Sequence, residues 1–377
     1  MIDESLNTIL KNKRNLCKGS FLNGSKSVMI YGAGNCGKDI LSIMSSQGIP
    51  VECFLDMKGS SNLQYNGISI MQPDSDSFTK TQRENVCVIL AIYNAYIDVM
   101  PIISMLKTYG YKNVITFVEL YSIFSSELGE RFWLAPLNYY DSLEDIITDG
   151  YNLWEDDLSK EIFKSVLKYR LTGNHEFSPK PDIGNQYFPK DIPGWQKPTR
   201  FVDCGSYDGD TIIQISRELG KIEAIAAFEP DPVNFSRLYN ILRLANSPFA
   251  KEILLWPCGL WSNSTQLKFS SGKDSGSAIS STGDIIIQCV SMDEVMLGFN
   301  PSFIKMDIEG AEYSAILGAK KTIFESKPQL AISLYHRPSD LWQIPLLLKQ
   351  WNLGYKFYLR VHQYNGFDLV LYAFTNN

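Results

Sequence analysis

The chain has 377 residues, of which 45% are hydrophobic and 12% aromatic. This length and composition predict two or three folded domains with packed cores and exclude a disordered chain. The formal net charge is −6, and a chain of this charge without a Lys/Arg run is not expected to bind nucleic acid. No apolar run approaches the roughly 20 residues that span a bilayer, and residues 1–6 lack a signal-peptide pattern. We therefore expect a cytoplasmic protein without a membrane span.

Seven cysteines are spread along the chain without a C-x-x-C pair. An odd number at these spacings favours neither a disulfide framework nor a zinc site. Cys204 follows an apolar strand and precedes a glycine turn, where a small buried residue packs well. We interpret it as a packing residue and not as a nucleophile.

Residues 1–120 are expected to form a small Rossmann-like α/β domain. Strands are predicted at 28–31, 51–55, 85–91 and 113–117, and helices at 35–47 and 95–107. This alternation is typical of a parallel sheet. The turn after the first strand opens a helix whose N-terminus suits a diphosphate, and a carboxylate at the end of the next strand suits a ribose. The candidate second nucleotide site comprises Gly32, Gly34, Asn35, Gly37 and Asp56.

Residues 121–198 are expected to connect two domains. Apolar residues at helical spacing from 119 to 170 predict helices, and no strand signal interrupts them. Five prolines between residues 177 and 199 prevent regular structure there. The aromatic residues among these prolines indicate a loop that packs against something, in the manner of a lid.

Residues 199–377 are expected to form the second α/β domain. Strands are predicted at 200–204, 224–228, 253–256, 302–307 and 329–334, with helices starting near 209, 231, 311 and 340. Residues 355–361 and 369–375 predict a terminal antiparallel pair on an otherwise parallel sheet. The Gly/Ser-rich residues 270–277 and 280–283 are typical of a surface loop; the alternative is a loop that closes over a ligand.

A turn and a carboxylate in this second domain indicate a nucleoside cofactor. The first strand ends at Asp203, and Gly205 and Gly209 allow a ligand to approach the backbone, while residues 206–208 supply N–H groups. Glu229 ends the next strand and can accept hydrogen bonds from both ribose hydroxyls. Tyr207 occupies the place of the middle glycine of a dinucleotide motif, so the turn favours a mononucleoside-like cofactor such as S-adenosylmethionine.

A second group of polar residues ends the fourth and fifth strands. Asp307, Glu309 and Glu312 surround the end of the fourth strand, and His336 ends the fifth. Carboxylates there can stabilise a sulfonium, bind a divalent metal or take a proton. His336 is a candidate base or metal ligand.

Four segments of the second domain together resemble the FkbM family of S-adenosylmethionine-dependent methyltransferases: residues 201–211, 228–232, 304–312 with 318–319, and 330–337 with 340–342. The resemblance implies a class I methyltransferase fold with a seven-stranded sheet, and O-methylation of a sugar, polyketide or other metabolite. It also implies that the turn and Glu229 hold the cofactor. The cofactor-binding candidates are Asp203, Gly205, Ser206, Tyr207, Asp208, Gly209, Glu229, Pro230, Asp231 and Asp307. The sequence departs from the family's commoner first motif at Tyr207 and Asp208.

Residues 28–37, 54–56 and 66–70 resemble the small Rossmann-like domain at the front of bacterial sugar-modifying acetyltransferases, where it binds a nucleotide sugar. The resemblance implies a nucleotide-linked sugar as ligand or acceptor. The same turn suits NAD, and a degenerate domain used only for packing or for a homo-oligomer interface is a further alternative.

We predict an S-adenosylmethionine-dependent O-methyltransferase that acts on a hydroxyl of a glycan, sugar or secondary metabolite. His336 is the predicted base, with Asp307 orienting acceptor or cofactor and Glu309 assisting. The rival arrangement uses Asp307, Glu309 and His336 as ligands of a divalent metal that polarises the hydroxyl. The competing functions are an NAD-dependent sugar-nucleotide oxidoreductase and a nucleotide-binding module without catalysis.

Overall fold

The structure is a computed structural model that describes residues 6–11, 21–22, 24–244, 249–270, 278–279 and 283–375. The chain divides into two compact units. The first unit comprises residues 1–148, 161–181 and 363–368, and the second comprises residues 149–160, 182–362 and 369–377. Residues of the predicted connector are thus shared between the two units, and the predicted limits at 120 and 198 stay predictions.

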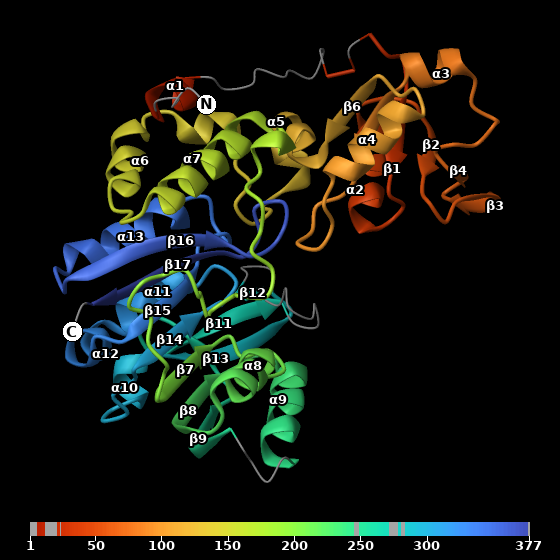
Figure 1. Cartoon of the computed structure of the whole chain (residues 1–377). Helices are drawn as coiled ribbons and strands as arrows, with labels where there is room; N and C mark the ends of the chain where they lie inside the picture. The colour runs from red at the N-terminus through yellow and green to blue at the C-terminus, as the bar shows by residue number, and fades with distance from the viewer. Residues whose placement is uncertain are drawn as a thin grey trace. The chain divides into compact units, whose positions relative to one another are not determined.

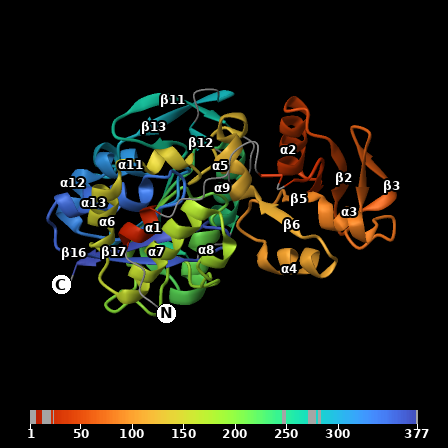
Figure 2. The same ribbon diagram turned by 90° about the horizontal axis from the view of Figure 1, so that it is seen from above.

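The first unit is built on a six-stranded sheet in the order β3-β4-β2-β1-β5-β6. Its strands are β1 (Val28–Tyr31), β2 (Val51–Leu55), β3 (Ser60–Tyr65), β4 (Ile68–Met71), β5 (Cys87–Leu90) and β6 (Asn113–Thr116). The predicted strands are present and pair in parallel, β1 with β2 and β5, and β5 with β6. Figure 2 shows α2 (Asn35–Ser46) on one side of this sheet and α4 (Met100–Thr108) on the other. This is the arrangement that right-handed crossovers in opposite directions produce.

Two features of the first unit were not predicted. The antiparallel strands β3 and β4 are joined by a turn at Asn66 and Gly67, which both have positive φ, as a tight hairpin requires. Helix α4 begins at Met100 and not at 95, because the Asn94 side chain accepts the N–H groups of Tyr96 and Ile97 and holds a turn there.

The remaining helices before the second sheet confirm the helical prediction for residues 119–170. They are α5 (Phe117–Leu128), η1 (Leu137–Tyr140), α6 (Glu144–Tyr151) and α7 (Asp157–Thr172), and the short elements α1 (Leu6–Lys11), α3 (Lys80–Asn85) and η2 (His175–Phe177) complete this part. Thr116 and Glu119 form a capping box that starts α5. Within the described part of the chain, no helix is long and apolar enough to cross a membrane.

The second unit is built on a seven-stranded sheet in the order β16-β17-β15-β14-β7-β8-β9 (Figure 1). The strands are β7 (Arg200–Cys204), β8 (Ile222–Phe228), β9 (Ala250–Trp256), β14 (Phe303–Met306), β15 (Gln329–Ser333), β16 (Tyr355–Val361) and β17 (Leu369–Thr375). β7, β8, β9, β14 and β15 run parallel, whereas β17 pairs antiparallel with β15 and β16. The predicted seven-stranded sheet with a terminal antiparallel pair is confirmed.

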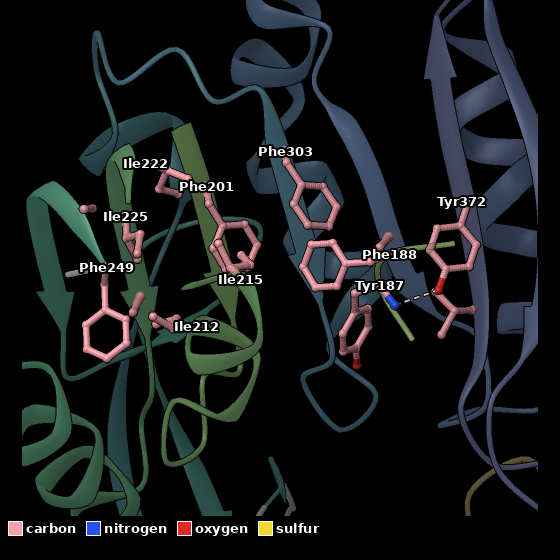
Figure 3. Packing of buried hydrophobic residues seen from close by; sticks show 14 of the residues in the cluster. Tyr187, Phe188, Phe201, Ile212, Ile215, Ile222, Ile225, Phe249, Phe303 and Tyr372 are labelled. Carbon is pink, nitrogen blue, oxygen red and sulfur yellow. Dashed lines mark hydrogen bonds between the residues drawn. The ribbon is translucent and has the colours of Figure 1, made fainter. Parts of the chain in front are cut away.

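Helices cover both faces of this sheet. They are α8 (Asp210–Leu219), α9 (Pro232–Leu244), α10 (Met292–Val295), α11 (Glu312–Gly318), α12 (Lys320–Ser326) and α13 (Asp340–Gln350). The core on one face joins Ile212 and Ile215 of α8 to Phe201 of β7, and Phe303 of β14 to Phe188 from the proline-rich segment (Figure 3). That segment therefore covers the part of the face that α8 and α9 leave open.

A second, four-stranded sheet in this unit was not predicted. It has the order β10-β13-β11-β12, formed by β10 (Gly259–Leu260), β11 (Thr265–Ser270), β12 (Ala278–Ile279) and β13 (Ile285–Val290). β11 pairs antiparallel with β12 and β13 around a small core of Phe269, Ile287 and Cys289. Most of the predicted Gly/Ser-rich loop, residues 271–277 and 280–282, lies outside the described residues.

Candidate active site

The glycine turn after β7 is held tightly against the end of β14. Gly205 and Gly209 have φ of +79° and +90°, and Tyr207 between them has φ of +48°. The N–H groups of Gly205 and Ser206 both donate to the Phe228 carbonyl oxygen at 3.0 Å. The turn is therefore fixed to the end of β8 as well as to its own strand. Of the three N–H groups expected to face a ligand, those of Ser206 and Tyr207 already have partners within the protein, the Phe228 carbonyl oxygen and the Glu229 carboxylate.

Replacing Gly205 tests how tightly the turn is packed. An added Cβ at Gly205 would lie 1.9 Å from the Asp307 carbonyl oxygen, whereas at Gly209 it would meet only the Leu238 Cδ1 atom at 3.1 Å. An alanine at either position would be strained by the positive φ, but only at Gly205 would its Cβ also clash with backbone atoms. We expect Gly205→Ala to cost about 3 kcal/mol or more of stability, and Gly209→Ala about 1–2 kcal/mol. Melting temperatures of the two variants would test this, and an equal loss would contradict the clash.

Glu229 stands at the end of β8 with both carboxylate oxygens oriented by backbone. Its Oε2 accepts the Tyr207 N–H and its Oε1 accepts the Asp231 N–H, each at 2.8 Å. Each oxygen has further lone pairs, so the carboxylate can still accept hydrogen bonds from a diol. Burial raises the pKa of Glu229 to about 7, although the two N–H bonds act in the opposite direction.

Asp203 forms a buried ion pair beneath the turn. Its Oδ1 lies 3.1 Å from the Lys305 Nζ, and that ammonium also donates to the Gly205 carbonyl oxygen at 2.6 Å. Burial raises the pKa of Asp203 to about 6, and the Lys305 charge opposes the rise. The cysteine that follows is also buried, which raises the pKa of the Cys204 thiol well above its ordinary value. This supports the packing interpretation of Cys204.

Asp307 follows β14 and lies at the centre of a second polar group. Its Oδ2 accepts a hydrogen bond from the Tyr187 hydroxyl at 2.9 Å, and its Oδ1 accepts a longer one, at 3.3 Å, from the Tyr335 hydroxyl. The side chain is 22% exposed. Burial would raise the pKa of Asp307, but the charges of His336 and Lys305 and the Tyr187 bond outweigh it and lower the pKa. The carboxylate is therefore ionised at neutral pH.

His336 lies between carboxylates on both sides of its ring. Its Nδ1 is 2.8 Å from Glu312 Oε1, and its Nε2 is 3.4 Å from Asp307 Oδ1 and 3.6 Å from Glu309 Oε2. Burial would lower the pKa of His336, but Glu312, Glu309 and Asp307 outweigh it and raise the pKa well above its ordinary value. The free protein therefore holds an imidazolium here.

The backbone brings these carboxylates to the histidine. Glu309 has φ of +54° and Gly310 of +92°, which turns the chain from β14 into α11. Glu312, the first residue of α11, is fully buried, and its Oε1 also accepts the Ile308 N–H at 2.8 Å. Asp340, which begins α13, lies nearby, and burial followed by the Glu312 charge raises the pKa of Asp340 to about 7.

The structure thus brings Asp307, Glu309 and Glu312 together around His336, and the close contact of Glu312 with the ring was not predicted. Asp203, Glu229 and Asp307 end neighbouring parallel strands, so they share the carboxyl edge of the sheet. Tyr187 and Tyr335 were not predicted as site residues, and Lys305 was assigned no role. Tyr187 comes from the proline-rich segment, 120 residues before Asp307, and only the aromatic residues of that segment indicated that it packs on the domain.

The predicted second nucleotide site belongs to the first unit. Gly32 has φ of +105°, and an added Cβ at Gly37 would lie 2.0 Å from the Gly32 carbonyl oxygen, so the turn and α2 pack closely. The same glycine pattern serves close packing whether or not a ligand binds. Asp56 follows β2, and its Oδ1 accepts the Lys58 N–H at 2.9 Å.

Comparison with known proteins assigns the second unit. Residues 203–357 match the family model of the methyltransferase FkbM domain. The chain is an S-adenosylmethionine-dependent methyltransferase. No curated protein matches the sequence of this methyltransferase.

The methyltransferase also resembles solved structures. The structure of methyltransferase FkbM from Methylobacillus flagellatus KT has a TM-score of 0.73 and 24% identity, covering 93% of this chain and 90% of that one, and it supports the fold. Fibrillarin from Aeropyrum pernix with bound S-adenosyl-L-methionine has a TM-score of 0.30 and 12% identity, covering 49% and 70%. The SAH-bound Podospora anserina methyltransferase PaMTH1 has a TM-score of 0.30 and 10% identity, covering 76% and 100%. These last two likenesses are too weak to support an argument.

Proposed function

We propose that this methyltransferase transfers the methyl group of S-adenosylmethionine to a hydroxyl of a sugar, glycan or secondary metabolite. The observation that carries the proposal is the ionised, partly exposed Asp307 on the same sheet edge as the glycine turn and Glu229. One end of this edge suits the nucleoside of a cofactor, and the other offers a carboxylate to an acceptor.

The proposed cofactor site follows the edge from β7 to β8. Glu229 binds the ribose diol through the lone pairs that the Tyr207 and Asp231 N–H groups leave free. Gly205 and Gly209 let the cofactor approach the backbone, and Asp307 faces the sulfonium. The other proposed contacts are Asp203, Ser206, Asp208 and Pro230, of which Asp203 acts through its ion pair with Lys305 beneath the turn.

Asp307 replaces His336 as the proposed proton acceptor. A base must have a free lone pair, and the surrounding carboxylates keep His336 protonated. In the proposed step the acceptor oxygen attacks the methyl carbon, the carbon–sulfur bond breaks, S-adenosylhomocysteine leaves, and the hydroxyl proton passes to the Asp307 carboxylate. Before the transfer, the charged His336 ring stabilises the ionised form of Asp307. Glu309 and Glu312 in turn keep the imidazole protonated.

A divalent cation remains the rival to this arrangement. Ligand atoms of Asp307, Glu312 and His336 lie within 4.8 Å of one another, so in this group Glu312 takes the place of the predicted ligand Glu309. A metal would have to displace the proton of the imidazolium, because each ring nitrogen faces a carboxylate oxygen. In the metal-free arrangement the two ring nitrogens keep their protons and face carboxylate oxygens.

The acceptor class rests on the first unit. In the Rossmann-like sheet of this unit, the glycine turn follows β1 and Asp56 follows the neighbouring strand β2. This arrangement suits a nucleotide-linked sugar whose phosphates lie at Gly32, Gly34, Asn35 and Gly37. We propose that this ligand carries or resembles the acceptor. If the turn binds NADH instead and no methyl transfer occurs, the oxidoreductase alternative replaces this proposal.

A radiolabel screen tests the proposed function. The whole chain is incubated with methyl-labelled S-adenosylmethionine and a panel of UDP-sugars, free sugars and polyols, and label in each product is counted. We expect label in a sugar-containing acceptor and its loss in Asp307→Asn. Cofactor binding without labelling of any hydroxyl compound would favour a binding module or another acceptor chemistry.

A further inference from the structure

The proline-rich segment of the second unit, residues 182–199, forms a strap that is anchored along its length. Its carboxylate Asp191 pairs with Arg360 of β16 at 2.7 Å. Gln196 exchanges two hydrogen bonds with Gln329 of β15, its N–H donating at 2.7 Å and its carbonyl oxygen accepting at 2.8 Å. Trp195 packs its ring edge-on against Phe303 and Tyr372, at centroid distances of 5.4 and 5.3 Å. The strap is therefore part of the fold of this unit.

A chain of hydrogen bonds fixes the start of the strap. His362 Nδ1 lies 2.9 Å from the Asp182 carbonyl oxygen, so this nitrogen carries the proton. His362 Nε2 then accepts from the Tyr372 hydroxyl at 2.8 Å. The Tyr372 oxygen in turn accepts the Tyr187 N–H at 2.8 Å, as the dashed line in Figure 3 shows. Burial lowers the pKa of His362, which agrees with this neutral ring.

This chain holds Tyr187 in a strained conformation with its side chain at the active site. Tyr187 has φ of +66°, which costs a non-glycine residue about 1–3 kcal/mol and persists only where the surrounding contacts impose it. Its ring lies 5.4 Å from the Lys305 Nζ, and its hydroxyl donates to Asp307 Oδ2 at 2.9 Å. Strain held at a residue whose hydroxyl reaches the central carboxylate points to a role in function.

We propose that Tyr187 is a positioning residue for methyl transfer. The strap holds Tyr187 so that its hydroxyl orients the Asp307 carboxylate toward the methyl group and the acceptor. A carboxylate fixed through one oxygen presents the other in a defined direction. Tyr335 and His336 approach that other oxygen, Oδ1, at longer distances of 3.3 and 3.4 Å, so an acceptor hydroxyl competes with weaker contacts there. This inference rests on the proposed function.

The test uses two cofactor analogues, so it does not need the acceptor. S-adenosylhomocysteine lacks the methyl group, whereas sinefungin carries an ammonium in the region of the methyl group. The wild-type chain is expected to bind sinefungin more tightly, because Asp307 attracts the ammonium. In Tyr187→Phe we expect this preference to fall about tenfold or more, with S-adenosylhomocysteine affinity unchanged, because a charge-assisted hydrogen bond is lost. Phe retains the ring over Lys305, so the variant isolates the hydroxyl.

Two further variants separate the outcomes. Tyr239→Phe, on an exposed residue of α9, should keep the full sinefungin preference. Tyr372→Phe removes the anchor of the Tyr187 N–H and should lower the preference as well as the melting temperature. If the wild-type chain binds neither analogue, the proposed function fails. If it prefers sinefungin and Tyr187→Phe does so equally, the proposed function stands and the role of Tyr187 is refuted.

Discussion

Asp307→Asn is expected to lower kcat for methyl transfer by about 10²–10⁴-fold, because the amide keeps the shape of the carboxylate but cannot take the acceptor proton. The Tyr187 hydroxyl and the His336 ring would still surround the side chain. S-adenosylhomocysteine affinity should change less than about threefold, since the ribose contacts of Glu229 remain. Steady-state kinetics with the acceptor from the radiolabel screen, together with calorimetric titration, measure the two effects.

A second variant identifies the proton acceptor, and a third serves as the control. The control Glu252→Gln, on an exposed carboxylate of β9, should leave kcat unchanged. If His336 were the base, kcat would fall more in His336→Gln than in Asp307→Asn. Dialysis against EDTA tests whether the site uses a metal. Activity that is lost on dialysis and restored by Mg²⁺ would favour a divalent cation bound at Asp307, Glu312 and His336 over a protonated, metal-free His336.

Glu229→Ala is expected to weaken binding of S-adenosylhomocysteine by about 10²-fold or more, because two charge-assisted hydrogen bonds to the ribose are lost. The Tyr207 and Asp231 N–H groups would also lose their acceptor, so the turn itself loosens. Glu229→Gln keeps part of this network and should bind more tightly than Glu229→Ala. Calorimetric titration of the wild type and both variants gives the comparison, and Glu252→Ala serves as the control.

The same carboxyl makes cofactor binding depend on pH. With the pKa of Glu229 at about 7 in the free protein, the group is mostly protonated at pH 6 and ionised at pH 8. If only the ionised form binds the diol, affinity at pH 6 should be about tenfold weaker than at pH 8. Glu229→Gln removes the titrating group and should flatten this dependence. A wild-type profile that is flat between these values would contradict the role of Glu229.

Local patterns predicted much of the second unit. The parallel strands were predicted from short apolar runs in the sequence. Because parallel strands share one direction, Asp203, Glu229 and Asp307 at their ends were expected on the same edge of the sheet. The four-stranded sheet was missed because its strands flank a Gly/Ser-rich insert, whose composition indicates a loop. The hairpin of β3 and β4 was missed although Asn66-Gly67 is a turn signal between them.

The site was predicted in part, for a physical reason. Residues that lie just beyond a strand can be placed from the sequence, and Asp307 and His336 were expected at this edge of the sheet in that way. Tyr187 reaches Asp307 through a strap whose path depends on His362, Tyr372 and Arg360, and no local pattern encodes such contacts. The charge state of His336 also follows from Glu312, a buried neighbour that sequence alone did not assign to the ring.

Calorimetric titration with S-adenosylhomocysteine and, in parallel, with NADH tests the central claim most directly. We expect micromolar binding of S-adenosylhomocysteine that Glu229→Ala weakens by about 10²-fold or more, and no competition from NADH. Tight binding of NADH without binding of S-adenosylhomocysteine would contradict methyl transfer and favour chemistry at the glycine turn of the first unit.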